Sequence, residues 1–136
     1  MTRLCKIAAV LAGVAGMIVL AQAPAGRGRG KGRGGAPVQP IQKVKPGFYM
    51  IPGAGANSGV RVTNAGVILV DGKLPSDTNY NDLMGQIKSV TNQPVKYLIV
   101  THHHQDHSGN DQRFLDAGIP VIAHENFNRQ LLTYAA

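Results

Sequence analysis

The nearly unbroken apolar run Val95–Val100 leads directly into the segment Thr101–His107, and this junction constrains the fold more than any other part of the chain. An apolar run of this length, ahead of polar residues, predicts a β-strand that is buried on both faces of a sheet. The seven residues after it read Thr-His-His-His-Gln-Asp-His. Because α/β folds place their ligands at the carboxyl ends of strands, the sequence predicts a ligand site in the loop that follows this strand.

Four of the five histidines of the chain lie in this loop, together with one carboxylate. Neutral imidazole nitrogen and carboxylate oxygen suit zinc, and also iron or manganese. Alternate side chains of an extended segment share a side, so His102 and His104 should converge while His103 points away. The alternatives are a solvated polar loop or an adventitious cluster like a purification tag, but a tag would sit at a terminus and lack the interleaved Asp106. We therefore predict that His102, His104, Asp106 and His107 form a metal site.

The rest of the apolar pattern predicts an α/β fold with a mixed β-sheet flanked by helices. Short apolar runs bounded by turn residues indicate strands, and an Asn-containing turn joins two of them into a hairpin. These strands are expected at residues 45–51, 59–63, 67–70, 95–100 and 119–123. Helical spacing predicts a helix after the potential cap Ser76, weakened by Gly85, and another at 126–134, with a further buried segment at 109–117.

Residues 1–25 have the pattern of a secretory signal peptide. Basic residues precede the apolar run Ile7–Leu20, which is shorter than the about 20 residues that span a bilayer, and small residues follow it. Cleavage is expected after Ala25, because a cut after Ala23 would leave a proline next to the scissile bond. The alternative is a retained membrane anchor. Cleavage predicts a secreted or periplasmic protein with no stable membrane span.

The net charge of +7 belongs mainly to the region before the folded domain. Six of the 14 Lys and Arg residues precede Ala36, so the remaining chain is close to neutral. We interpret residues 26–44 as a Gly-, Arg- and Pro-rich flexible linker and 45–136 as the domain. Gly-Arg repeats can bind RNA, but an exported protein meets little of it, so no nucleic-acid partner is expected. The lone Cys5 lies in the signal peptide, which leaves the mature chain without a disulfide.

The motif and its flanks resemble the signature of the metallo-β-lactamase fold. The residues that carry this resemblance are His102-x-His104-x-Asp106-His107, the apolar strand and Thr101 before them, and Ser108-Gly109-Asn110 after them. The resemblance extends from about Gly47 to the end of the chain and includes a hairpin that ends in Leu69-Val70-Asp71. It implies an αββα sandwich and a metal-dependent hydrolase.

The resemblance also implies a role for each motif residue. His102 and His104 would bind a first metal ion, whereas Asp106 and His107 would belong to a second. Asp106 would in addition be the catalytic residue that orients the attacking water, and Asp71 would support the site. The cofactor would be one or two zinc ions. A metal-bound hydroxide would hydrolyse an ester, amide or phosphoester-type bond in a small-molecule substrate.

Only the first of the two similar αβ halves of this fold has a counterpart here. The later ligands of the family are missing, and His124 fits a helix-start or surface role better than a ligand role. A half sandwich should expose one sheet face, which would favour self-association. We expect a fragment of a longer reading frame; the chain could instead be an inactive remnant, or two copies could pair. The alternative function is a non-catalytic secreted module for metal binding or interaction.

Overall fold

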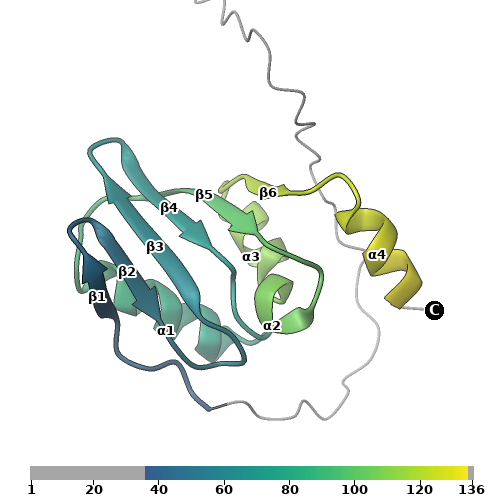
Figure 1. The fold of residues 1–136 in the computed structure, drawn as a ribbon, viewed down its shortest axis with the longest axis horizontal. Coiled ribbons are helices and arrows are strands. Elements are labelled where there is room, and N and C mark those ends of the chain that lie inside the picture. The colour runs from purple at the N-terminus through teal and green to yellow at the C-terminus, as the bar shows by residue number, and fades with distance from the viewer. Residues whose placement is uncertain (1–35, 135–136) are drawn as a thin grey trace, which may run out of the picture.

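The computed structural model describes residues 36–134, which form one sheet with helices against it (Figure 1). The predicted signal peptide and residues 26–35 of the predicted linker lie outside this range. The strands are β1 (Gln42–Lys45), β2 (Phe48–Ile51), β3 (Ser58–Thr63), β4 (Gly66–Val70), β5 (Val95–Val100) and β6 (Val121–Ala123). The helices are α1 (Asp77–Lys88), α2 (Gln105–Ser108), α3 (Asp111–Asp116) and α4 (Phe127–Tyr134).

The six strands follow one another across the sheet in the order of the sequence. Strands β1 to β4 pair antiparallel, whereas β4, β5 and β6 pair parallel. The parallel pairs require crossovers, which α1 provides between β4 and β5, and α2 with α3 between β5 and β6. The mixed α/β architecture is therefore confirmed. It places the carboxyl ends of β4 and β5 at the same edge of the sheet.

The β3–β4 hairpin and helix α1 form where local sequence signals predict them. Thr63 pairs with Gly66 across the two-residue turn, and the Thr63 hydroxyl donates to the Gly66 carbonyl at 2.7 Å. The Ser76 hydroxyl accepts from the backbone N–H of Asn79 at 2.9 Å, which caps the amino end of α1 as expected. No helix among residues 36–134 is long and apolar enough to cross a membrane.

The core lies between one face of the sheet and helices α1 and α3, which are behind the sheet in Figure 1. Leu69 and Leu98 from the parallel strands are fully buried there, as are Leu83 of α1 and Phe114 of α3. The Phe114 and Tyr80 rings meet edge to face with centroids 5.0 Å apart. This packing fixes α3, and with it the chain that follows the histidine motif, against the sheet.

The prediction that the Val95–Val100 strand is buried on both faces is wrong for the described chain. Tyr97 is 45% exposed and Ile99 is 37% exposed, because both side chains point away from the helices. Within the described residues, Tyr97 and Ile99 are thus two exposed apolar side chains on one face of β5. The strand is apolar on both faces, but no other part of residues 36–134 fully covers the face that carries Tyr97 and Ile99.

Two further differences concern the ends of elements. The fold begins earlier than the expected boundary at residue 45, since residues 42–44 of the predicted linker belong to strand β1. Val38 and Ile41 also pack against the core. The motif was expected to be a loop throughout, but its second half forms the short helix α2. Neither β1 nor α2 has an apolar periodicity that would mark it in the sequence. Pairing with β2 makes the first segment a strand, and packing near Asp71 fixes the second as a helix.

Candidate metal centre

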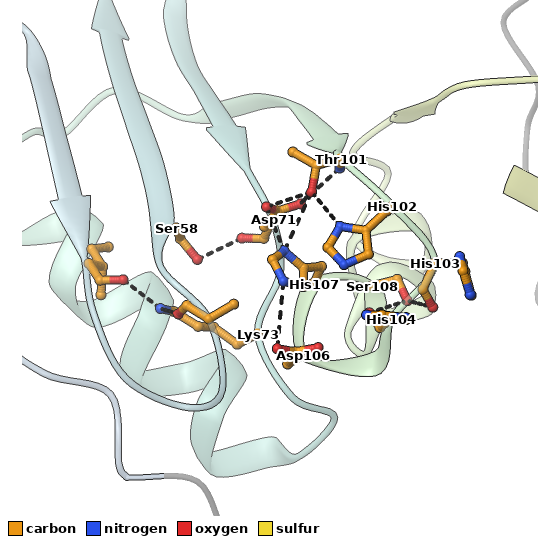
Figure 2. Close-up of polar contacts among 12 residues, drawn as sticks. Ser58, Asp71, Lys73, Thr101, His102, His103, His104, Asp106, His107 and Ser108 are labelled. Atoms are coloured by element: carbon orange, nitrogen blue, oxygen red, sulfur yellow. Dashed lines mark hydrogen bonds and ion pairs between the residues drawn. The ribbon is translucent and has the colours of Figure 1, made fainter.

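The histidine motif and Asp71 meet at the carboxyl ends of the neighbouring parallel strands β4 and β5 (Figure 2). Asp71 directly follows β4, and Thr101 and His102 directly follow β5. Helix α2 then turns the chain so that His107 faces Asp71, with Asp106 on the other side of the His107 ring. Parallel pairing of β4 with β5 is what brings these residues together, although about thirty positions separate them in the chain.

Asp71 is a buried carboxylate that holds three groups of the motif segment. Its Oδ1 accepts the backbone N–H of Thr101 at 2.9 Å, and its Oδ2 accepts the Thr101 hydroxyl at 2.9 Å. The same Oδ2 lies 2.8 Å from Nδ1 of His107. The φ angle of Asp71 is +64°, a left-handed conformation that few residues other than glycine, asparagine and aspartate adopt. The supporting role expected for Asp71 agrees with these contacts.

These contacts select one tautomer for two of the histidines. A carboxylate only accepts hydrogen bonds, so His107 must donate through Nδ1, which leaves the lone pair on Nε2. The single hydroxyl proton of Thr101 goes to Asp71, so the 3.0 Å contact between Thr101 Oγ1 and His102 Nδ1 requires His102 to donate as well. Both rings therefore present Nε2 as a lone-pair donor when they are neutral.

The rings of His102 and His107 lie close together, and the ring of His104 lies beside His102. Centroid separations are 4.0 Å between His102 and His107, and 4.6 Å between His102 and His104. The His103 ring is farther from His102, at 6.3 Å, in line with the expected alternation. Partial burial, followed by the neighbouring His107 and His104, lowers the pKa of His102, which favours its neutral form.

The carboxylate of Asp106 completes the cluster. Its Oδ2 lies 3.6 Å from Nε2 of His107, which is too long for a hydrogen bond. The donor chemistry fits a divalent metal, since imidazole nitrogen and carboxylate oxygen converge from one loop. In residues 36–134, however, no group of three or more His, Cys, Asp or Glu side chains is arranged to hold a metal ion. The four predicted ligands are thus neighbours, and their metal binding stays a prediction.

His124 lies in the turn just before α4, close to the helix-start role expected from the sequence. Its Nδ1 accepts the backbone N–H of Asn126 at 3.2 Å, and its carbonyl accepts from Phe127 at 2.9 Å. The side chain is exposed. These bonds account for His124 within the turn that leads into α4.

Several residues to which the sequence analysis gave no role hold the backbone beneath the site. The Ser58 hydroxyl donates to the Asp71 carbonyl at 2.7 Å, and the Gly72 N–H donates to the His107 carbonyl at 2.6 Å. The Asn110 amide donates to the Gly72 carbonyl at 2.7 Å and to the Leu74 carbonyl at 3.0 Å. Ser58 carries no signal in the sequence, and Asn110 is recognised only as part of the motif flank, so the structure alone reveals what these side chains bind.

Asp111 is a buried carboxyl group close to this support. It is 7% exposed, and its Oδ1 has no hydrogen-bond partner among the described residues. Burial, and secondarily the charge of Asp71, raises the pKa of Asp111 from 3.8 to about 8. The folded chain therefore keeps Asp111 mostly protonated at neutral pH, whereas the unfolded chain ionises it.

Asp111→Asn is expected to flatten the pH dependence of stability. The stability that Asp111 contributes is present below about pH 4 and is lost as the pH rises towards 8, because the folded state binds its proton more tightly. Asparagine cannot ionise, so the variant should unfold at higher urea concentration than the parent at pH 8 to 9. Urea titrations with a chelator at pH 5, 7 and 9 measure this. The exposed Asp82→Asn is the control, and parallel pH profiles for the parent and Asp111→Asn would refute the assignment.

The structure is thus an α/β fold that gathers histidines and carboxylates at the carboxyl ends of its parallel strands, where such folds place their ligands. The sequence profile of the metallo-beta-lactamase superfamily matches residues 51–135. The chain belongs to this superfamily, which is in general a family of hydrolases.

Similarity to individual proteins covers part of their length. The chain is 31% identical over 87 residues to the beta-lactamase-like protein 2 homolog of Caenorhabditis elegans, a match of 58% of this chain and 30% of that protein. It resembles the metallo-beta-lactamase FIM-1 from Pseudomonas aeruginosa, solved in a mono-zinc form, with a TM-score of 0.62 at 20% identity over 74% of this chain and 47% of that one. A metallo-beta-lactamase from Pontibacter korlensis gives a TM-score of 0.62 at 19% identity over 72% and 48%. The chain thus spans less than half the length of these relatives.

Proposed function

We propose that this chain supplies the amino-terminal part of the active site of a metal-dependent hydrolase, with zinc as the preferred metal. The single observation that carries the proposal is the hydrogen bond between Asp71 and His107 Nδ1, at 2.8 Å. It turns the lone pair of His107 Nε2 towards Asp106 Oδ2, so two acceptors face one another at 3.6 Å. A divalent cation would satisfy both. Carboxylates that orient a ligand histidine in this way recur in metal sites.

The chain's own residues would prepare the site for the metal. His102 and His104 would hold one ion, and Asp106 with His107 would contribute to a second. When bound, the metal would activate water and polarise the bond to be hydrolysed. Asp106 would also accept a proton from the attacking water and orient it, while Asp71 keeps the His107 ring in the ligand tautomer. The reaction proposed is hydrolysis of an ester, amide or phosphoester-type bond in a small molecule.

An interaction module without catalysis is the second candidate. The exposed Tyr97 and Ile99 on the open sheet face favour it, because such a face suits another protein surface or a second copy. Secretion or a periplasmic location, predicted from residues 1–25, is compatible with either candidate.

Asp71→Asn is expected to lower zinc affinity about 10- to 100-fold, the usual effect of losing a carboxylate behind a ligand histidine. Asparagine tolerates the left-handed backbone at this position, so the change isolates the hydrogen bonds. The Asn side chain has one acceptor oxygen in place of two, so it cannot accept all three hydrogen bonds from Thr101 and His107, and its NH2 group would face one of these donors. Competition titration with a chromophoric chelator measures the affinity, and the exposed Asp82→Asn serves as the matched control.

Two results would overturn the proposal. One is a parent chain that binds less than one zinc ion per molecule in the titration. The other is an Asp71→Asn variant with the affinity of the parent. The same zinc-loaded chain, assayed with ester, β-lactam and phosphodiester substrates, distinguishes the hydrolase from the non-catalytic module.

A further inference from the structure

Lys73 is a buried lysine just beyond Asp71 whose side chain extends away from the histidine cluster (Figure 2). Its exposed fraction is 0%, and its φ angle is +73°. Both features are unfavourable in themselves, since an ammonium loses its hydration on burial and a lysine rarely adopts left-handed backbone. Such a residue persists only where its surroundings fix it firmly, and strained positions of this kind cluster near functional sites.

The ammonium of Lys73 replaces its hydration with three backbone carbonyls. Nζ donates to the Ile51 carbonyl at 2.5 Å, to the Gly53 carbonyl at 3.0 Å and to the Ala56 carbonyl at 2.5 Å. An ammonium has three N–H donors, so the set is complete. Desolvation, opposed by the charge of Asp71, lowers the pKa of Lys73 to about 8, and at neutral pH the amine still carries all three protons.

All three carbonyls belong to the end of β2 or to the segment of residues 52–57 that connects β2 to β3, here called the β2–β3 loop. The loop has little regular structure of its own, and Ala54 has a φ of +50°. Besides Lys73, three backbone hydrogen bonds hold it: the Leu74 N–H donates to the Ala54 carbonyl at 3.0 Å, the Gln39 N–H to the Pro52 carbonyl at 2.9 Å, and the Ala54 N–H to the Ala36 carbonyl at 2.5 Å. Lys73 is the side chain that binds three carbonyls of this region at once, in addition to these backbone hydrogen bonds.

The β2–β3 loop also touches the predicted metal ligands. Gly55, with a φ of +96°, lies so close to Asp106 that a Cβ on Gly55 would be 2.5 Å from the Asp106 Cβ. The same Cβ would be 2.9 Å from Leu74 Cγ. The loop is thus wedged between the segment after β4 and the amino end of α2, and its position limits where the Asp106 carboxylate can lie.

We propose that Lys73 is a positioning residue that holds the β2–β3 loop as a fixed wall against Asp106. Through this wall it keeps the Asp106 carboxylate facing His107. The role for Asp106 in metal binding rests on the proposed function, whereas the docking of the loop by Lys73 does not. Nothing else in the described chain supplies a charge to these three carbonyls, so removing the ammonium should release the loop.

The first test is hydrogen exchange of the metal-free chain in the presence of a chelator. Lys73→Met keeps the apolar stem of the side chain and removes the three donors. The amides of Ala54 and Leu74 should exchange at least about tenfold faster, because both take part in the docked loop. The amide of Leu69, in the middle of the sheet, should be unchanged. Lys88→Met, on the exposed face of α1, is the matched control and should leave all three amides unchanged.

Two outcomes of this exchange experiment would overturn the inference. One is an unchanged exchange rate at Ala54 and Leu74 in a folded Lys73→Met chain. The other is equal acceleration at Leu69, which would mean general destabilisation without a specific role for the loop. If Lys73→Met does not fold, Lys73→Gln is measured in the same way. Gln keeps part of the donor set, so the amides of Ala54 and Leu74 should exchange faster than in the parent but more slowly than in a free loop. An unchanged exchange rate in Lys73→Gln would refute the proposal.

The second test is the affinity of the same variants for Co²⁺ by competition titration. Lys73→Met should bind at least about tenfold more weakly than the parent, with Lys88→Met unchanged. A parent chain that binds no Co²⁺ would count against the proposed function, and the exchange experiment would still decide the docking of the loop. Faster loop exchange with undiminished Co²⁺ affinity would remove the link from Lys73 to Asp106.

Discussion

The double substitution His102→Ala/His104→Ala is expected to weaken zinc binding by more than about 1,000-fold. Both rings leave the cluster, so the loss should exceed the about 10- to 100-fold effect of removing a supporting residue behind a ligand. The backbone should tolerate the change, because neither side chain is part of the apolar core. Zinc competition titration measures the affinity, and circular dichroism checks that the chain is still folded.

His103→Ala is the matched control, since it removes an imidazole from the same loop. The alternation of side chains places His103 away from His102, with ring centroids 6.3 Å apart, and it is not an expected ligand. Its zinc affinity should stay within about threefold of the parent. An equal loss in the control and in the double variant would show that the histidines act as an unspecific cluster, which contradicts the assignment of ligands.

Gly109→Ala is expected to destabilise the chain by about 2–4 kcal/mol and to disturb the motif helix. Gly109 has ordinary right-handed backbone, so the effect does not come from its φ angle. A Cβ at this position would lie 2.5 Å from the backbone N of Pro75, and it would also meet the Gln105 carbonyl. Both obstacles are backbone atoms, so α2 or the segment before α1 would have to move. Urea unfolding of the metal-free chain measures the change.

Gly85→Ala is the natural comparison, because it makes the same chemical change in the middle of α1. Nothing lies within 4 Å of a Cβ at Gly85, which is exposed. Alanine there should stabilise the chain by about 1 kcal/mol through its higher helix propensity. Effects of opposite sign at the two glycines are the expected result, and a stabilising Gly109→Ala would disprove the close packing of α2 against Pro75.

Most elements of the fold were predictable from local sequence patterns. The β3–β4 hairpin, the cap at Ser76 and the strand Val95–Val100 depend on neighbouring residues, so periodicity and turn chemistry locate them. Strand β1 was missed because its residues are exposed and all but Val44 are polar, so that pairing with β2 makes it a strand. The burial of β5 was overestimated because an apolar sequence does not state whether both of its faces are covered.

The candidate site divides in the same way. The motif identifies His102, His104, Asp106 and His107 because four donors occur within a few positions after a strand. The residues beneath them carry no such signal. Lys73 and Ser58 are distant in the chain from the groups they bind, and a lysine or serine outside a motif is usually read as a surface residue.

The sequence by itself determined the family, the α/β class and the segment that carries the predicted ligands, because each depends on residue types at short spacing. Only the tertiary structure decided which nitrogen His107 presents, since that choice depends on Asp71, which the parallel pairing of β4 with β5 brings within 2.8 Å. It likewise decided that Lys73 is buried among three carbonyls of the β2–β3 loop. Hydrogen bonds act over about 3 Å of space whatever the separation along the chain, so the fold had to be known before these roles could be assigned.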